Sequence, residues 1–179
     1  MKDSLSCSVI YMKRMEISLA SGLDNTKAVR TSGEVDVLLR DIRPWLYRLA
    51  LAITTRPDLA EDAAQEALLR ATRSRQKLMT VNEPKAWLRT VVVRCALTAL
   101  SSSRPQELAD RLVNTDPTES LAVQQILGRL DPTDRVILAL VHFEGLSYAE
   151  IGDSVGIPVG TVASRLHTAR EAFRAEWKK

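Results

Sequence analysis

Residues 145–166 read GLSYAEIGDSVGIPVGTVASRL, and their cap and turn residues predict how the C-terminal part of the chain folds. Ser147 is a favourable N-cap residue, and Glu150 stands at the position where the two would form a capping box. Gly156 suits the left-handed conformation that a tight turn after a helix needs. Pro158 breaks the chain just before a second helical stretch. A helix, a short glycine turn and a second helix together predict a helix-turn-helix motif.

The second helix of this motif has an apolar side and a polar side. Four apolar residues recur at helical spacing and are expected in the core: Val162, Leu166, Ala169 and Phe173. The outer face is then expected to hold Thr161, Ser164, Arg165 and Thr168. Short polar side chains and an arginine suit the base edges and phosphates of a major groove, which favours DNA binding. The plainer alternative is a helical bundle whose outer face is only solvated.

The rest of the chain also predicts helices, over residues 34–54, from about 59 to 75, and from 84 to about 100. Pro44 is expected to cause a local kink or a late helix start. Asp58 is expected to cap the second helix, and Pro84 to take the first position of the third. Further helices are expected near Thr118 and after the cap Asp131. Residues 77–84 are expected to form a loop. Because nothing indicates a hairpin or a βαβ unit, the predicted fold class is all-α.

The helix predicted from about residue 59 to 75 has an unusual polar face. Opposite a stripe of alanines lie Asp62, Gln65, Glu66 and Leu69, so that a leucine stands within an acidic surface. A partner with basic residues around an apolar pocket would explain this leucine. A stray exposed leucine is equally compatible with the pattern, since single exposed apolar residues are common.

The helix predicted from Pro84 mixes an aromatic residue with basic and polar ones, namely Trp87, Arg89, Thr90 and Arg94. This mixture suits single-stranded nucleic acid, where bases stack on aromatic rings and phosphates need positive charge. The alternative for Trp87 is a core residue, which is the more frequent role of a tryptophan at the start of such a helix.

Composition excludes several classes of protein. The chain has 179 residues and a net charge of +3, with basic blocks on either side of an acidic segment over residues 105–128. No apolar stretch is long enough to span a bilayer, and the first residues lack the pattern of a secretory signal. Cys7 and Cys95 are expected to be ordinary thiols of a reducing cytoplasm. No phosphate-binding loop, metal-ligand spacing or catalytic triad is present, so we expect neither an enzyme nor a cofactor.

Three motifs, in order, resemble the extracytoplasmic-function (ECF) sigma factors of the sigma-70 family. Residues 58–71 (DLAEDAAQEALLRA) are similar to the signature of the σ2 domain, and residues 86–89 (AWLR) to the start of its promoter-melting helix. Residues 130–170 resemble the σ4 domain. The resemblance implies a mobile tail (1–33), a σ2 domain (34–104), a flexible linker (105–117) and a σ4 domain (118–179). Thr98 and the serines at 101–103 depart from the family, which commonly has Asp and a basic run there.

The resemblance also implies partners. The acidic face with Leu69 would dock on the β′ clamp helices of core RNA polymerase. The −10 promoter element would be captured and melted by Lys77, Asn82, Trp87, Arg89, Thr90 and Arg94. The −35 element would be read by Thr161, Ser164, Arg165, Thr168 and Arg170. Leu138, Val141 and Phe143 would contact the β flap or pack in the core.

A separate anti-sigma protein would regulate the factor, which is expected to be a monomer when free and to have no membrane insertion. Two other hypotheses are a stand-alone helix-turn-helix regulator and an adaptor that binds polymerase without productive DNA contact.

Overall fold

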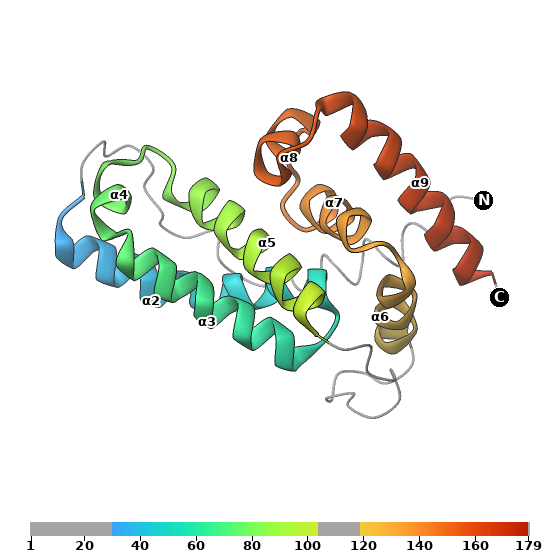
Figure 1. Ribbon diagram of the computed structural model, residues 1–179, viewed down its shortest axis with the longest axis horizontal. Helices are drawn as coiled ribbons and strands as arrows, with labels where there is room; N and C mark the ends of the chain where they lie inside the picture. Colours follow the sequence, from blue (N-terminus) through green and yellow to red (C-terminus); the bar gives the residue numbers. More distant parts are fainter. Residues whose placement is uncertain (1–29, 104–118, 179) are drawn as a thin grey trace.

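The computed structural model describes residues 30–103 and 119–178, and throughout these ranges the regular structure is α-helical (Figure 1). The helices are α2 (Ser32–Thr54), α3 (Pro57–Arg73), α4 (Arg75–Thr80), α5 (Pro84–Ser102), α6 (Glu119–Arg129), α7 (Pro132–His142), α8 (Tyr148–Val155) and α9 (Val159–Trp177). The all-α prediction is confirmed. The expected tail up to residue 29, with Cys7, and the whole of the expected linker over residues 105–117 lie outside the described residues.

Helices α2, α3 and α5 pack against one another and form the first unit, with the short α4 at one end (Figure 1). The alanine stripe of α3 is buried, as its spacing predicts, and small side chains let neighbouring helices approach closely. From α2, Leu46, Leu49 and Ile53 fill the space between the helices, each fully buried. Exposed surface on α3 is therefore confined to the side opposite the alanines.

The first unit begins earlier than predicted. A capping box between Thr31 and Glu34 starts α2 at Ser32, and the helix continues through the exposed Pro44, so this proline does not mark a late start. Arg30 is buried; its backbone N–H donates to the carbonyl of Met79 at 2.7 Å and its guanidinium to the carbonyl of Val81 at 2.7 Å. Residues 30–33 thus belong to the folded unit rather than to a tail.

Two local predictions in this unit are wrong. Asp58 does not cap α3, because Pro57 already occupies the first turn; its carboxylate pairs instead with the guanidinium of Arg56, the N-cap residue, at 2.6 Å. Residues 77–84 are not all loop, because α4 runs to Thr80 and buries Leu78 against the core. A helix of six residues with one buried residue is too short to show a period in the sequence.

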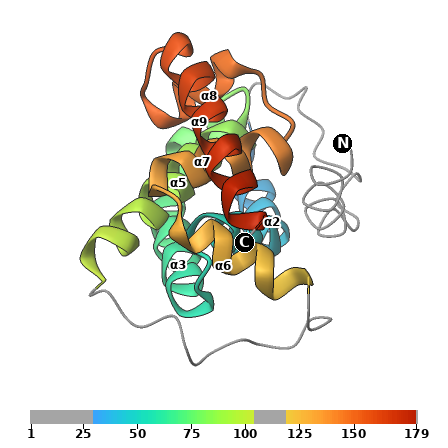
Figure 2. The same cartoon turned by 90° about the vertical axis from the view of Figure 1, so that its right-hand side faces the viewer.

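Helices α6 to α9 form the second unit (Figure 2). The carboxylate of Asp131 accepts from the N–H of Thr133 and so caps α7, as predicted. Ser147 and Glu150 form the predicted capping box at the start of α8, and Gly156 ends that helix in the left-handed region at φ 81°. The helix-turn-helix of α8 and α9 is therefore set by the local signals that the sequence carries.

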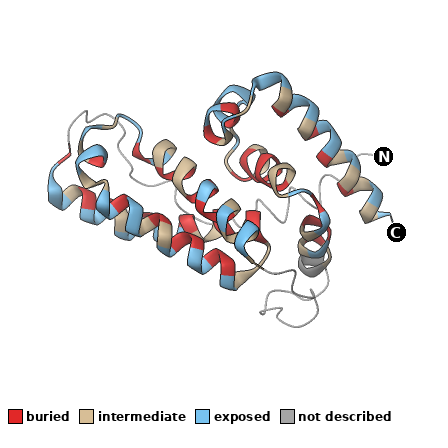
Figure 3. Cartoon of the chain, in the orientation of Figure 1, coloured by how far each residue is buried: buried red, intermediate tan, exposed pale blue. Residues whose placement is uncertain are grey.

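The buried side chains of both units form one apolar cluster (Figure 3). Leu138 and Phe143, two of the residues considered for a β-flap contact, are buried in it, and Val141 is half-buried against it. Arg135 of α7 crosses between the units: its guanidinium donates to the carbonyl of Thr54 and the hydroxyl of Thr55, both at 3.3 Å. This places a cation at the negative C-terminal end of α2.

None of the helices in the described ranges combines the length and the apolar character that crossing a membrane requires.

Candidate functional site

The exposed side of α3 carries the four residues predicted to dock on a partner. Asp62, Gln65 and Leu69 are exposed and Glu66 is half-buried. The side chain of Leu69 is 52% exposed, among the largest exposures of a large apolar residue in the described chain. Glu66 accepts a hydrogen bond from the guanidinium of Arg70 at 2.7 Å, which fixes the carboxylate at the edge of this surface. We call these four residues the α3 face.

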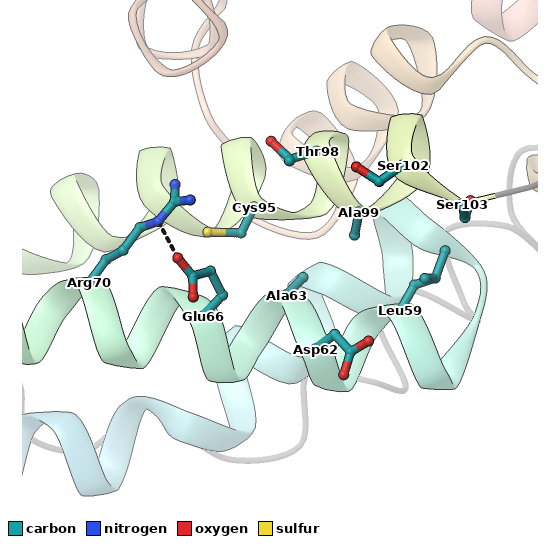
Figure 4. Close-up of a pocket in the computed structure, with 10 residues that line it drawn as sticks. All are labelled: Leu59, Asp62, Ala63, Glu66, Arg70, Cys95, Thr98, Ala99, Ser102 and Ser103. Atoms are coloured by element: carbon teal, nitrogen blue, oxygen red, sulfur yellow. Dashed lines mark hydrogen bonds and ion pairs between the residues drawn. The ribbon is translucent and has the colours of Figure 1, made fainter.

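A groove of about 330 Å³ between α3 and the C-terminal half of α5 adjoins the α3 face (Figure 4). It shares Asp62 and Glu66 with that face. Its other lining residues are Leu59, Ala63, Arg70, Cys95, Thr98, Ala99, Ser102 and Ser103. Burial raises the pKa of the Cys95 thiol. The departures from the family pattern at Thr98 and the serine run therefore lie beside the α3 face.

The residues predicted to bind the −10 element lie on and around α4 and on α5 as far as Arg94. All of them except Arg89 are exposed or half-buried. Lys77 is exposed and places its ammonium 5.5 Å from the ring centre of the half-buried Trp87. Asn82 is exposed, and its carbonyl accepts from Arg30 at 3.5 Å. Farther along α5, Thr90 is half-buried and Arg94 exposed. Arg89 differs: it is buried and contacts Glu144 of the second unit at 3.3 Å.

On α9 the predicted inner residues Val162, Leu166, Ala169 and Phe173 are all buried. Of the outer residues, Ser164 and Thr168 are exposed and Thr161 is half-buried. Arg165 turns toward the start of α7, where it pairs with Asp134 at 2.9 Å and Asp131 at 3.3 Å. The hydrogen bond that this guanidinium donates to Asp134 raises its pKa. Arg165 therefore does not extend freely from the outer face as the helical wheel predicts.

Arg170 also departs from an outward position. It is half-buried, and its Nε is a buried donor without a hydrogen-bond partner in the described chain. Its charge contributes to lowering the pKa of His142, whose first cause is burial of the imidazole. Arg170 thus lies near α7 rather than on the free side of α9.

His167 is the residue that sequence reasoning missed on this surface. It is exposed on α9 between Ser164 and Thr168, where the free face also includes Ala163. The signal was available, because positions 163, 164, 167 and 168 lie on one side of a helix. The outer face of α9 is therefore small and polar and carries a single imidazole.

Comparison with known proteins agrees with this two-unit architecture. The Sigma-70 region 2 family matches residues 38–105, and the Sigma-70 region 4 family matches residues 120–173. The ECF RNA polymerase sigma factor SigL of Mycobacterium tuberculosis is 32% identical over 143 residues, which cover 72% of this chain and 80% of SigL. SigW of Bacillus subtilis is 28% identical over 73% of this chain and 82% of SigW. SigE of Mycolicibacterium smegmatis is 30% identical, and the match covers 78% of this chain and 60% of SigE.

Two solved structures share the fold. The sigma factor RpoE of Bartonella quintana, in complex with the anti-sigma factor NepR, superposes with a TM-score of 0.68 at 21% identity, over 81% of this chain and 97% of RpoE. CnrH, in complex with the cytosolic domain of CnrY, gives a TM-score of 0.64 at 17% identity, over 96% of this chain and 97% of CnrH. Two helical units matching regions 2 and 4 define a transcription initiation factor of the sigma-70 type, and the chain belongs to the ECF RNA polymerase sigma factors.

Proposed function

We propose that this chain binds core RNA polymerase through the α3 face and directs it to a restricted set of promoters. Leu69 carries the argument: more than half of this side chain is exposed, within a surface that also holds Asp62 and Glu66. A solvated helix gains nothing from such a residue, whereas a basic partner with an apolar pocket would bury it. The β′ clamp helices of the polymerase are the partner that membership of the family indicates.

The test replaces Leu69 by arginine in a purified transcription system with bacterial core polymerase. We expect Leu69→Arg to reduce promoter-specific run-off transcripts at least tenfold, because a charge would enter the apolar centre of the contact. Val37→Arg is the matched control: Val37 lies on α2, is 50% exposed, and receives the same charge outside the α3 face. Transcription by Leu69→Arg equal to that of Val37→Arg would refute docking through this face.

For DNA, the proposal assigns the −10 element to the surface of Lys77, Asn82, Trp87 and Arg94. The support is the proximity of Lys77 to the Trp87 ring, which combines positive charge with an aromatic face on which a base could stack. The −35 element is assigned to the outer face of α9, with Ser164 and Thr168, where exposed short polar side chains can approach base edges. Because Arg165 and Arg170 are turned toward α7, few phosphate contacts are expected from α9.

Regulation by an anti-sigma protein is part of the proposal. One structure that shares this fold is the complex of the sigma factor RpoE with the anti-sigma factor NepR, and a second is CnrH with the cytosolic domain of CnrY. A stand-alone helix-turn-helix regulator is the alternative function, and such regulators usually bind paired half-sites as dimers. Two results would count against that alternative: sedimentation of the free chain as a monomer, and no affinity of the chain for palindromic DNA duplexes.

A further inference from the structure

Glu144 joins the two units through three donors that all come from the first unit. This residue follows α7, and its carboxylate is only 5% exposed. The indole N–H of Trp45 donates to Oε1 at 2.6 Å. The guanidinium of Arg89 lies 3.3 Å and the ammonium of Lys85 3.7 Å from Oε2. A carboxylate of the second unit thus occupies a cluster of positive and N–H groups on α2 and α5.

These donors form an anion site in which Glu144 leaves one N–H group without an acceptor. The ammonium of Lys85 lies 5.0 Å from the ring centre of Trp45, which holds two of the donors together. Arg89 is only 9% exposed, and its Nε is a buried donor for which the described chain offers no acceptor. Glu144 receives three contacts, from Trp45, Lys85 and another nitrogen of Arg89, and none of them reaches this Nε. Lys85 and Arg89 also lie near the positive N-terminal end of α5.

The place of the site indicates its natural ligand. Arg89 is on the helix whose exposed residues are assigned to the −10 element, and the other face of that helix start carries Trp87 beside Lys77. A DNA phosphate has the charge of Glu144, and the tetrahedral arrangement of its oxygens could bring one of them to the Nε of Arg89 in a bidentate pair. The second unit contacts this site while the two units are packed together, because the Glu144 carboxylate lies 3.3 Å from the Arg89 guanidinium.

We propose that Trp45, Lys85 and Arg89 form a binding site for a backbone phosphate of promoter DNA, and that Glu144 occupies this site while the two units are packed together. Separation of the units exchanges the Glu144 carboxylate for the phosphate, so Glu144 is an internal competitor of DNA. This inference rests on the proposed function, because it assumes that the surface of α5 meets DNA.

The test measures the affinity of the full chain for a fluorescently labelled single-stranded 20-mer of mixed sequence, by anisotropy at fixed salt. Glu144→Gln keeps the shape and an acceptor for Trp45 but removes the competing charge, so we expect binding at least fivefold tighter than that of the unchanged chain. Asp153→Asn is the matched control, since Asp153 is an exposed carboxylate of the same unit on α8. It should give less than a twofold gain.

Arg89→Met completes a double-mutant cycle. Added to Glu144→Gln, it should abolish the gain, and the slope of log affinity against log salt should lose about 0.7, the value of one phosphate contact to a single strand. Thermal unfolding followed by circular dichroism shows that each variant is folded. Equal affinities for Glu144→Gln and Asp153→Asn, or a gain that persists in the Arg89→Met background, would overturn the proposal.

Run-off transcription with core polymerase distinguishes failure of the phosphate site from failure of the proposed function. If Glu144→Gln shows no gain in DNA affinity while the unchanged chain transcribes from its promoter, the phosphate site is refuted and the proposed function stands. If the unchanged chain gives no transcript with core polymerase, the proposed function fails, whatever the anisotropy shows.

Discussion

Gly152 shows how one missing methyl group permits the turn between α8 and α9. A Cβ added there would lie 2.8 Å from the carbonyl oxygen of Ile157, which is backbone and cannot rotate away. We expect Gly152→Ala to lower the free energy of unfolding by about 1–3 kcal/mol, the usual cost of overpacking. Gly160→Ala is the control, because a Cβ at that helical position meets nothing within 4 Å. It should change stability by less than about 1 kcal/mol in urea unfolding; equal losses in both variants would contradict the steric argument.

His142 predicts a pH dependence at the residue scale. Burial, and then the charge of Arg170, lower its pKa below the ordinary 6.5. Because the folded state binds the proton less readily than the unfolded state, this contribution to stability is present above pH 6.5 and is lost as the pH falls through 6.5 toward the lowered pKa. Urea unfolding between pH 7.5 and 5 should show a decrease of at most about 1.4 kcal/mol per pH unit.

His142→Gln should flatten this decrease, whereas His167→Gln, a change on the exposed face of α9, should retain it. The window stays above pH 5 because the carboxylates with lowered pKa values, such as Asp58 and Glu150, have ordinary values of 3.8 and 4.5. If the stability of His142→Gln decreased with falling pH as much as that of the unchanged chain, another titrating group would be responsible for the decrease.

At the scale of the element, the capping box gives α8 a defined start. The hydroxyl of Ser147 accepts from the N–H of Glu150 at 3.3 Å, and the Glu150 carboxylate accepts from the N–H of Ser147 at 2.9 Å. We expect Ser147→Ala to reduce stability by about 1 kcal/mol, since the orphan N–H of Glu150 loses its acceptor. Ser164→Ala removes an exposed hydroxyl from within α9 and should have almost no effect. A smaller loss for Ser147→Ala than for Ser164→Ala would show that the cap does not stabilise the helix.

The elements could be predicted where local chemistry determines them. Asp131, Ser147 and Gly156 define helix ends through their own side chains or backbone freedom, so their positions in the sequence sufficed. The short α4 could not be predicted, because its only buried residue is Leu78 and one buried residue shows no helical period. The α3 face follows from periodicity alone, since the alanine stripe fixes which side of the helix stays exposed.

At the scale of the whole molecule, local patterns fail where a residue meets a distant partner. Arg89 is expected on a free DNA-binding surface, but it is buried and its guanidinium donates to Glu144, 55 positions later in the chain. Arg165 was likewise expected to face outward, and its partners Asp134 and Asp131 lie on another helix start. A helical wheel gives the direction of a side chain from its own axis and contains nothing about the element opposite.

While the two units are packed together, one proposed binding surface is exposed and the other is covered. This difference predicts the order in which polymerase and DNA bind. Leu69 is 52% exposed while Glu144 covers Arg89, so polymerase can dock before DNA reaches the phosphate site. A peptide of the β′ clamp coiled coil should bind the unchanged chain and Glu144→Gln with Kd values within about twofold of each other, whereas Leu69→Arg should weaken binding at least tenfold. Isothermal titration calorimetry provides the measurement. If Glu144→Gln tightened binding to the clamp peptide as much as binding to DNA, the packed second unit would hinder the α3 face as well. Polymerase could then bind only after the two units had separated, and the predicted order would be wrong.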